Sequence, residues 1–445
     1  MSGPAGGLRI AYLLLRPPSY SETFIEAEIR AVRAAGATVE VFVTGGDGGG
    51  RIGEAGRVAR ALLRHPVRTV ALVRTLGLRY GPRAWLAAAY ALRVAPRVAR
   101  FGPDVVHTHF VNLPTAVTVL VGRLLGRPAT AMAHAADLLL ERDRTSLDRR
   151  LRRLGHLFVI SGATVRQLTV RGVSMARVPH TVVRAAFDGA VTATGRPPRS
   201  GTGVRKLVTV ARLVAKKGVG TAIDAVADLV AAGQQVRYDV YGDGPLRADL
   251  RRQVAARGLD RVVTLHGAVP HQVATAALAD ADVAVLPCQL APDGDLDGIP
   301  VFLMEAGGRG VPVVTTPVSG IPELVDPASG WLVPPADPAA LADAIGQVLA
   351  DPQRAAGRAT ALAERIRTEF TPARQADRLL AVWRDLAGPP ASTTAAPPTG
   401  TAAAPPTGTA AAPPTGTAAA PPTGTAAPPA GGAAGPGRGG PGGWS

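Results

Sequence analysis

The sequence predicts a two-lobed α/β protein followed by an unstructured tail, and three observations lead to this prediction. Strand-like and helix-like segments alternate along most of the 445 residues, a pattern typical of parallel sheets with helices on both faces. A stretch poor in large apolar residues, Ala190 to Gly203, divides the alternation into two parts. From Pro397 the sequence PPTGTAAA recurs without apolar bulk, so we expect the end of the chain to be disordered.

These features predict five segments along the chain. They are a first Rossmann-like domain (1–189), a linker (190–203), a second domain (204–370), a terminal helix (371–388) and a disordered repeat tail (389–445). Because ligands in open α/β sheets bind beyond the carboxyl ends of the strands, we expect functional residues in the connections that follow strands.

The first domain opens with a strand, a helix and a second strand. The helix begins at a capping box, Thr23-x-x-Glu26, in which each side chain satisfies a backbone N–H of the first turn. The glycine-rich run that follows, GGDGGG, is expected to be a loop rather than a dinucleotide site, because it opens no tight turn into a helix. The expected elements are a strand at 9–15, a helix at 23–35, and strands at 38–44, 104–107 and 129–133.

The second domain repeats the alternation more regularly. Short apolar runs rich in β-branched residues predict strands, and amphipathic stretches between them predict helices. The expected strands are 206–210, 237–241, 262–265, 283–286 and 311–315, and the expected helices are 220–232, 245–257, 273–279 and 300–308.

Cysteine content and hydropathy indicate the compartment. Cys288 is the only cysteine, so no intramolecular disulfide can form and a reducing, cytoplasmic location is expected. We expect this thiol to be a small buried filler at a strand end. The apolar run Ile10 to Leu15 is shorter than the apolar core of a signal peptide. Leu113 to Gly126 comes nearest to a membrane span, but Arg123 interrupts it.

The net charge of +16 is concentrated in one segment. Arginines interleaved with apolar residues fill Arg51 to Arg100, where the single acid is Glu54. Such a segment suits an anionic membrane surface, such as the inner face of the plasma membrane. It equally suits a solvated helix face. A positive field also attracts nucleic acid, but the sequence contains no recognisable nucleic-acid-binding module, so nucleic acid is not expected as a partner.

An anion site is predicted within ARLVAKKGVGTAID. Arg212 ends a strand, and Lys217 follows five residues later, directly before a helix. Unpaired N–H groups and the helix dipole add to these side-chain charges. Only Lys206, Lys216 and Lys217 are lysines among 49 basic residues, and a compact ammonium fits a phosphate oxygen well.

The stretch DGDLDGIPVFLME, Asp293 to Glu305, permits two interpretations. It begins like a calcium-binding loop, but such a loop needs a bidentate Glu at position twelve, which here is Met304. The alternative is a sugar-nucleotide site, in which Pro300 occupies the first helical position and Gly298 allows close approach of a ligand. We favour the second interpretation. A similar helix start is expected at SGIPELV, where Pro322 and Glu323 open another helix.

Eight short stretches occur in order between Arg9 and about Leu386: SETFIEAEI, HTHF, AHAADL, ARLVAKKG, YGDGPLRADL, LHGAVP, DGIPVFLMEA and SGIPELV. Together they resemble the retaining glycosyltransferases of family 4, which have the GT-B fold of two Rossmann-like lobes with a cleft between them. Asp297 and Glu305 have the spacing of that family's E-x7-E motif. The SETF and DGIP forms are most similar to bacterial transferases of colanic-acid and other exopolysaccharide assembly.

The resemblance implies roles for individual residues. The implied catalytic group is His134, Asp297, Arg212 and Lys217. Among these, Arg212 and Lys217 would bind the donor diphosphate, and Asp297 with the backbone of Gly298 and Ile299 would hold the transferred sugar, near His134. Glu305 would bind the ribose hydroxyls, and the loop at Ser21 and Glu22 would face the acceptor. The resemblance implies no metal and no cofactor beyond the nucleotide-sugar substrate.

Two departures from the family pattern bear on these roles. Asp297 replaces the more usual Glu, which shortens its reach by one methylene and bears on which sugar is held. The stretch VPHTVVRAAF, Val178 to Phe187, lacks the usual Asn-Gly-Val-Asp form, and this leaves the role of His180 open.

The other histidines are interpreted from their positions. His107 and His109 lie at a strand end, and we expect both to be structural. His134 follows a strand and precedes Asp137 closely, which favours a functional role. No cysteine or second histidine lies near His134 in the register of a zinc site.

The sequence therefore predicts a metal-independent retaining transferase that moves a sugar from a nucleotide diphosphate to a glycan or lipid-linked glycan acceptor. Two other functions remain open. A GT-B epimerase of nucleotide sugars would share the lobes and the phosphate site. A non-catalytic protein that binds carbohydrate or a membrane surface would bind no nucleotide.

Overall fold

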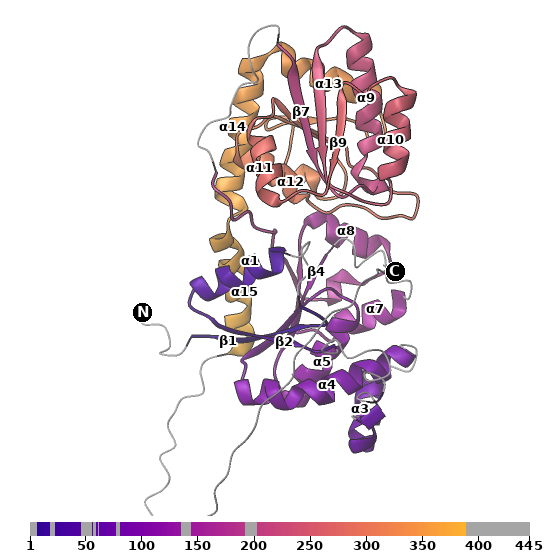
Figure 1. Ribbon diagram of the computed structural model, residues 1–445. Helices are drawn as coiled ribbons and strands as arrows, with labels where there is room; N and C mark the ends of the chain where they lie inside the picture. Colours follow the sequence, from indigo (N-terminus) through magenta and orange to yellow (C-terminus); the bar gives the residue numbers. More distant parts are fainter. Residues whose placement is uncertain are drawn as a thin grey trace, which may run out of the picture. The chain divides into compact units, whose positions relative to one another are not determined.

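The computed structural model describes residues 7–17, 23–45, 56, 59–60, 62–76, 81–134, 144–191 and 203–388 (Figure 1). Several predictions fall outside these residues: most of the glycine-rich loop, most of the linker, the repeat tail, Asp137, and the acceptor-side Ser21 and Glu22. Among the described residues, the strands form two six-stranded sheets, and every strand pair within them is parallel.

The first sheet has the strand order β2-β1-β3-β4-β5-β6. Its strands are β1 (Arg9–Leu14), β2 (Thr38–Val43), β3 (Val105–His109), β4 (Ala129–Ala133), β5 (His156–Val159) and β6 (His180–Val182). Its helices are α1 (Thr23–Ala34), α3 (Pro66–Leu76), α4 (Pro82–Phe101), α5 (Leu113–Leu125), α7 (Arg144–Leu151) and α8 (Gly162–Val170), with a 3₁₀ turn η2 (Met175–Arg177).

The second sheet has the order β12-β11-β10-β7-β8-β9. Its strands are β7 (Arg205–Val210), β8 (Val236–Tyr241), β9 (Val263–Gly267), β10 (Val283–Leu286), β11 (Val313–Thr315) and β12 (Trp331–Leu332). Its helices are α9 (Val219–Ala231), α10 (Arg247–Ala256), α11 (His271–Ala279), α12 (Val301–Gly308), α13 (Pro338–Ala350) and α14 (Pro352–Glu369), with 3₁₀ turns η3 (Ala215–Lys217) and η4 (Ile321–Glu323).

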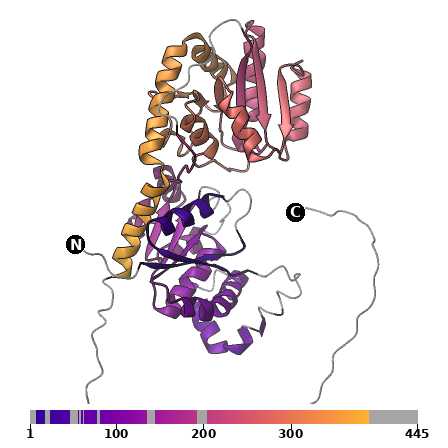
Figure 2. The same cartoon turned by 60° about the vertical axis from the view of Figure 1, so that its left-hand side comes forward.

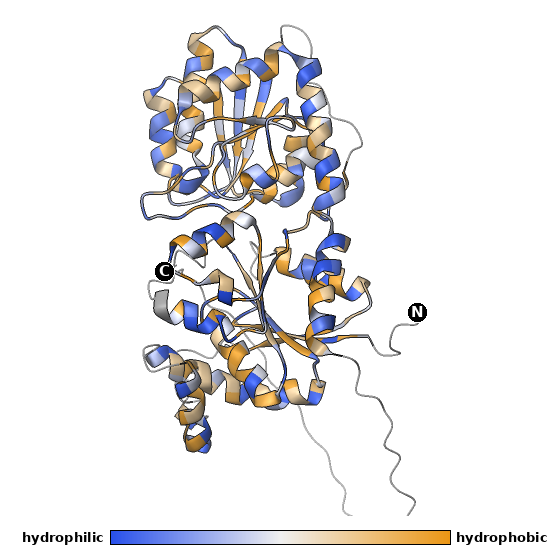
Figure 3. Cartoon of the chain, turned by 180° about the vertical axis from the view of Figure 1, so that it is seen from behind, coloured by the Kyte–Doolittle hydropathy of each residue, from blue (hydrophilic) through white to orange (hydrophobic). Residues whose placement is uncertain are grey.

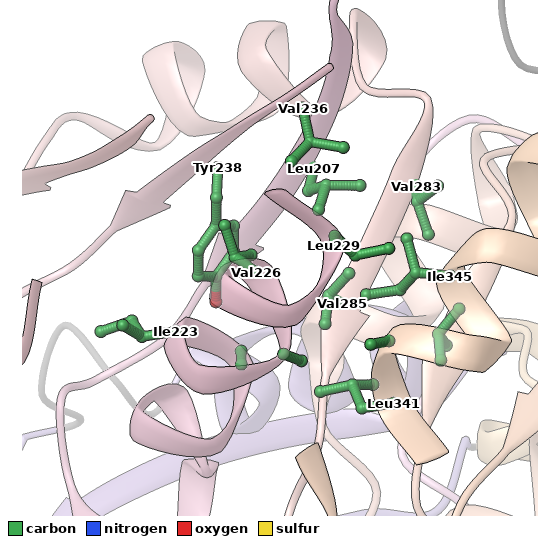
Figure 4. Close-up of a cluster of buried hydrophobic side chains, with 14 of the residues drawn as sticks. Leu207, Ile223, Val226, Leu229, Val236, Tyr238, Val283, Val285, Leu341 and Ile345 are labelled. Carbon is green, nitrogen blue, oxygen red and sulfur yellow. The ribbon is translucent and has the colours of Figure 1, made fainter. Parts of the chain in front are cut away.

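The core of the second sheet follows from its apolar pattern. Strand β10 reads VAVL and is buried along its whole length, as expected of a central parallel strand covered on both faces. On α9, Ile223, Val226 and Leu229 recur at helical spacing and pack in one buried cluster with Tyr238 of β8 (Figure 4). The helices carry alternating hydrophobic and hydrophilic bands (Figure 3), which is the pattern of helices with one buried face.

The last three helices begin with the same device. In α13, α14 and α15 (Pro372–Ala387), a polar residue caps the first turn and a proline follows it. The side chains of Asp337, Asp351 and Thr371 each accept a hydrogen bond from a first-turn N–H. Proline has no N–H and a fixed φ, so it suits the position directly after such a cap.

Helix α15 packs against α1 of the first domain (Figures 1 and 2). Its fully buried Trp383 donates its indole N–H to Thr130 Oγ1 of β4 at 3.1 Å. The ring of Trp383 also lies against the rings of Tyr12 and His107. The chain therefore returns from the second sheet to complete the core of the first.

The expected strands and helices of both domains are present, with ends that differ by a few residues at most. One expectation is wrong: the stretch SGIPELV forms only the three-residue turn η4 and does not form a longer helix. A longer helix could in any case not continue past Val325, because Asp326 precedes Pro327 and a residue before proline is disfavoured in the α conformation. The apolar stretch Leu113 to Gly126 forms α5, most of whose residues are buried. None of the helices in the described ranges is long and apolar enough to cross a membrane.

Candidate active site

Each sheet contains one point where the strand order reverses. In the first sheet it lies between β1 and β3, and in the second between β7 and β10. The connections that leave two such strands run in opposite directions, so they open a crevice beyond the carboxyl ends, where α/β proteins bind ligands. The predicted site residues follow strands at or next to these two reversal points.

At the β7/β10 reversal, two residues predicted from separate motifs form a pair. Lys217, at the end of η3, donates a hydrogen bond from Nζ to Oδ2 of Asp297. Lys216 Nζ lies 2.9 Å from Asp295 Oδ2 and 3.8 Å from Asp297 Oδ1. Two lysines thus neutralise two aspartates of the stretch Asp293 to Glu305, which begins like a calcium-binding loop. The cations that pair with these carboxylates are the ammonium groups of Lys216 and Lys217.

Gly218 makes this pairing possible. It adopts a left-handed conformation with φ 66°, which costs glycine little. A Cβ atom built on it would lie 1.9 Å from the carbonyl oxygen of Pro287, directly after β10. Only glycine at position 218 therefore allows the backbone after β7 to approach the backbone after β10 this closely. Lys217 directly precedes this contact.

Burial and the Asp297 carboxylate together shift the pKa values of Lys217 and Cys288. Burial lowers the pKa of Lys217, but the Asp297 carboxylate opposes this, with smaller contributions from Cys288 and Asp295, and the net pKa is raised. Cys288 is buried, with Sγ 3.6 Å from Asp297 Oδ2. Burial first, and then Asp297, raise the pKa of this thiol. Lys217 is therefore held charged and Cys288 protonated.

The start of α9 adds the anion-binding feature predicted from the sequence. Its N-cap is Gly218, which has no side chain to satisfy the first-turn N–H groups. These groups are left for a ligand, with the positive end of the helix dipole behind them. Arg212 follows β7 and is exposed, and its guanidinium has no partner among the described residues. The predicted cations thus flank an uncapped helix start.

Glu305 lies inside α12, beyond the loop that carries Asp297. Its side chain is 16% exposed and its Oε1 is 3.9 Å from Nε2 of His271, the first residue of α11. Burial raises the pKa of Glu305, while His271 and Arg309 oppose the rise. The helix begins at Val301, with Pro300 as an extended N-cap, one residue later than expected. Gly298 and Ile299 are half-buried before it.

At the other reversal, three polar side chains form a chain of hydrogen bonds. His134 directly follows β4, and its Nε2 lies 3.1 Å from Nδ1 of His109 on β3. The Nε2 of His109 lies 3.0 Å from Oε1 of Glu28 on α1. His109 and Glu28 are buried, whereas His134 is half-buried. His134 is therefore connected through His109 to the buried carboxyl group of Glu28.

The Glu28 carboxylate is the centre of this group. Oε1 also accepts a hydrogen bond from the Tyr12 hydroxyl at 2.9 Å, and Oε2 accepts one from Gln375 Nε2 of α15 at 2.9 Å. Burial first, and then Glu28, raise the pKa of Tyr12 well above 10.0, so its hydroxyl stays a donor. Three elements, β1, β3 and α15, therefore converge on one carboxylate of α1.

His107 lies beside this group and differs from His109. Its Nδ1 is 2.8 Å from Thr130 Oγ1, and its buried Nε2 has no hydrogen-bond partner. Burial first, and then His109, lower its pKa well below 6.5. Donor atoms of Glu28, His107 and His109 lie within 4.8 Å of one another, which makes them a possible metal-binding group among the described residues.

The ring of His134 is flanked by Phe24 of α1 and Phe110 after β3, at centroid distances of 4.8 Å and 5.0 Å. Phe110 has φ 71°, a strained conformation for a bulky residue that is characteristic of functional sites. Burial first, and then His109, lower the pKa of His134 from 6.5 to about 3, against an opposing effect of Glu28. His134 is therefore neutral near pH 7.

His180 has a local contact. It lies on β6, and its Nδ1 is 2.8 Å from the carbonyl oxygen of Val178. This bond fixes one ring nitrogen within its own segment.

Sequence reasoning missed Glu28 and the link through His109. One signal was available, because Glu28 shares the spacing of Ile25, Ile29 and Val32, which form the apolar face of α1. An acid on a face that becomes buried needs hydrogen-bond partners, and two histidines two residues apart on one strand point to the same face.

Two Rossmann-like sheets define a fold of the GT-B class. Residues 21–183 match the family described as Glycosyltransferase Family 4, and residues 204–351 match Glycosyl transferases group 1. A glycogen synthase of Mycobacterium tuberculosis is 30% identical over 317 residues, which cover 64% of this chain and 72% of that protein. The chain belongs to the family 4 glycosyltransferases.

Two further proteins illustrate the similarity. A putative colanic acid biosynthesis glycosyltransferase, WcaL of Salmonella typhimurium, is 43% identical over 172 residues, or 38% of this chain. That match spans only 39% of the length of the relative. The crystal structure of HepE of Anabaena in complex with UDP superimposes with a TM-score of 0.62 at 17% identity, covering 84% of this chain and 98% of HepE. This last likeness concerns the fold.

Gly218→Ala should separate the two backbone segments of the second reversal point. Because a Cβ atom would meet the Pro287 carbonyl and φ is positive, we expect the free energy of unfolding to fall by more than about 1 kcal/mol. Gly220→Ala is the matched control, since its Cβ would meet the end of the flexible Gln253 side chain at 3.1 Å. Urea unfolding of both variants checks this. Equal stability would contradict the role assigned to Gly218.

Proposed function

We propose that this protein transfers a sugar from a nucleoside diphosphate donor to a carbohydrate or lipid-linked glycan acceptor, with retention of configuration, in exopolysaccharide or cell-envelope glycan synthesis. The observation that carries the proposal is the Lys217–Asp297 pair beside the uncapped start of α9. A cation, free amides and a carboxylate together match a ligand with an anionic diphosphate next to a sugar rich in hydroxyl groups.

The donor diphosphate binds to Arg212, Lys217 and the first amides of α9 in this proposal. These groups stabilise the negative charge that develops on the departing diphosphate. Lys217 must then exchange Asp297 for a phosphate oxygen. Lys216 supports that exchange, because its Nζ lies 3.8 Å from Asp297 and can keep the carboxylate neutralised.

The remaining residues hold the sugar and the nucleoside. Asp297, once released by Lys217, accepts hydrogen bonds from sugar hydroxyls beside the backbone of Gly298 and Ile299. Glu305, deeper in α12, accepts the ribose hydroxyls. His134 binds the sugar from the first domain, and Ser21 and Glu22 face the acceptor. The family membership of the chain and the name of its colanic-acid relative support this assignment.

Retention is proposed to proceed on one face of the sugar. The acceptor hydroxyl attacks from the side of the leaving group, and a phosphate oxygen takes its proton. The new glycosidic bond forms as the bond to the diphosphate breaks. No protein nucleophile is needed, which suits an Asp297 carboxylate engaged by Lys217 and Cys288.

Lys217→Ala should weaken the binding of UDP or GDP itself by about 10-fold or more, since a hydrogen bond to a charged group contributes roughly 1.5–3 kcal/mol. Lys206→Ala is the control, because Lys206 lies at the amino end of β7 and pairs with Asp280. Calorimetry with whichever nucleotide the wild type binds checks this. Unchanged affinity in Lys217→Ala would remove Lys217 from the donor site.

We propose that transfer requires no metal ion, because lysine and arginine supply the positive charge at the diphosphate. Activity should therefore persist in excess chelator. Glu305→Gln should raise the KM for the donor or abolish turnover, while Glu364→Gln, whose carboxylate pairs with Arg367 on the surface, should not. Steady-state kinetics of both variants, with and without EDTA, check this. Activity that is lost in chelator and restored by calcium would favour the calcium loop.

The alternative functions predict different products. An epimerase would release a nucleotide sugar of inverted configuration without any acceptor. A non-catalytic carbohydrate-binding protein would bind no nucleotide. Incubation with a panel of nucleotide sugars, with and without an oligosaccharide acceptor, separates the three possibilities.

We further propose that the protein, in the cytoplasm, binds the anionic inner face of the plasma membrane through α3 and the turn before it. Leu63, Val67 and Val70 are 79%, 81% and 42% exposed. Val67 and Val70 are three residues apart and share one face of α3, and Leu63 lies in the segment before this helix. Arg64 and Arg68 are exposed between them. The opposite face of α3 is buried. An apolar stripe interleaved with arginines is the pattern of helices that lie in a membrane interface.

Two double substitutions and one single control substitution test the proposed binding to anionic membranes. Binding to vesicles that contain anionic lipid should fall as salt rises, since exposed charges are screened within about 10 Å at 0.1 M salt. Leu63→Ser with Val67→Ser, and Arg64→Gln with Arg68→Gln, should each reduce co-sedimentation. Val170→Ser, at an 84% exposed position of α8, should not.

A truncated chain that ends at Gly388 tests the location of the binding surface. It should bind vesicles and retain transferase activity, because Arg438 is the only charged residue of the tail. If the full chain sediments with vesicles and the truncated chain does not, the tail is responsible and the assignment to α3 is wrong.

A further inference from the structure

We propose that a cavity at the amino ends of β4 and β5 binds a phosphorylated ligand through the guanidinium groups of Arg123, Arg127 and Arg153. The ligand is a multivalent phosphate without a nucleobase, either free in solution or in a lipid headgroup. This inference does not rest on the proposed function, because the cavity lies at the opposite end of the strands from the candidate active site. Ala129 of the cavity opens β4 and His134 follows it, about 16 Å along the strand at about 3.3 Å per residue.

The cavity lies where helices of the first domain meet the entries to two strands. Helices α3, α5 and α7 contact one another (Figure 1). Thr75 of α3 and Val119 of α5 form part of the cavity wall, and the connections that lead into β4 and β5 form the rest. The cavity volume is about 430 Å³, which is within the range of small-molecule sites. It therefore has room for a phosphate and the group that carries it.

Close backbone contacts hold the segments that carry the arginines. A Cβ atom built on Gly122 of α5 would lie 2.8 Å from the carbonyl oxygen of Arg127, so the chain folds back tightly after this helix. The N–H of Gly155 donates to the carbonyl oxygen of Ala129 at 2.8 Å. The entry to β5, which carries Arg153, is thus fixed beside the entry to β4. The three arginines are mounted on one connected backbone frame.

The three guanidinium groups are exposed, and none has a hydrogen-bond or ion-pair partner in the part of the chain that the structure describes. Between Glu54 and Asp137 the only acid of the sequence is Asp104, whose carboxylate accepts a hydrogen bond from a backbone N–H of β1. Asp148 of α7 is engaged by Arg152 at 2.6 Å. The acids nearest in sequence are therefore occupied elsewhere, and the cavity keeps its positive charge.

The arginines also repel one another. Burial first, and then the charges of Arg149 and Arg123, lower the pKa of Arg153. The negative end of the α5 dipole favours a cation in the last turn, which accounts for Arg123, but this effect does not extend to two further arginines beyond the helix. Like charges gathered around a cavity destabilise the unliganded protein, and a bound anion would relieve this repulsion.

The chemistry of the cavity favours phosphate among anions. A guanidinium donates two parallel hydrogen bonds to phosphate oxygens, and three guanidinium groups carry more charge than a single carboxylate balances. No aromatic side chain lines the cavity among the described residues, so it offers no ring on which a nucleobase could stack. A phosphate attached to a small polar group matches both features.

Arginine modification locates the site directly. The full-length protein is treated with phenylglyoxal, with and without inorganic diphosphate at constant ionic strength, and the modified residues are identified by mass spectrometry. Diphosphate should slow the modification of Arg123, Arg127 and Arg153. It should leave the rate at Arg177 unchanged, which is exposed on η2 of the same domain. Absence of protection in the cavity, or equal protection of Arg177, would overturn the proposal.

Charge-matched variants separate a built site from a general positive field. Arg127→Gln with Arg153→Gln should weaken diphosphate binding by about 10-fold or more, because each removes charged hydrogen bonds to the ligand. Arg152→Gln with Arg177→Gln removes the same charge outside the cavity and should change the affinity by less than a few fold. Calorimetry uses full-length chains that also carry Lys217→Ala, so that the proposed donor site contributes little.

Equal losses of affinity in the two double variants would overturn the proposal. The Tm of the unliganded cavity variant should stay unchanged or rise, because the substitutions remove repulsion and add no buried polar group. A lower Tm with unchanged affinity for diphosphate would assign the arginines to stability instead of binding.

Vesicles distinguish the two sources of phosphate. Phosphatidic acid exposes a phosphate monoester, whereas phosphatidylglycerol carries a phosphodiester, and the two vesicle types are matched in total negative charge. If the cavity variant loses a wild-type preference for phosphatidic acid, the ligand is a lipid headgroup. If only diphosphate binding is lost, the ligand is a soluble phosphorylated compound. If the cavity variant loses neither, the proposal is wrong.

Discussion

The desolvated carboxylate of Glu28 is the constraint on which the first domain depends. An unpaired charge in a protein interior is strongly unfavourable, so each of its lone pairs needs a donor. The donors come from β1, β3 and α15, and the last of these is 347 residues away in sequence. Removing one partner would leave a buried polar group unsatisfied. The return of the terminal helix to the first sheet is thus a requirement of this charge as well as of apolar packing around Trp383.

The second sheet uses a different interaction at the equivalent position. There the carboxylate of Asp297 pairs with lysines at the edge of the domain, where a ligand can compete for them. Burial lowers the pKa of Lys217, but the pair with Asp297 opposes this and the net pKa is raised. In the function proposed above, the positive charge of Lys217 is therefore in place before substrate binds, and a preorganised charge needs no reorganisation during reaction. One reversal point holds a buried carboxyl group enclosed by hydrogen-bond donors, and the other holds a carboxylate paired with lysines.

The extent to which sequence predicted these features depends on the range of the interactions. Strands such as β4 and β10 match their predicted ranges, because apolar runs and turn residues are local signals. Lys217 and Asp297 were both identified, but their mutual pairing was not, since it depends on the approach that Gly218 permits. Glu28 was overlooked because its partners lie on other elements. The short η4 was mistaken for a longer helix, although Pro327, four residues after its last residue, already limited how far a helix could continue.

The two acidic residues of the proposed donor site, Asp297 and Glu305, differ in a way that bears on mechanism. Asp297 is bound to Lys217 and contacts the Cys288 thiol, and such interactions lower the nucleophilicity of a carboxylate. Glu305 is mostly buried, and its raised pKa reflects a position that disfavours charge. Each has hydrogen-bonding capacity to offer sugar hydroxyls, but neither is an exposed, unpaired carboxylate of the kind that attacks an anomeric carbon. The electrostatics of this motif therefore favour a role in holding the donor over covalent catalysis.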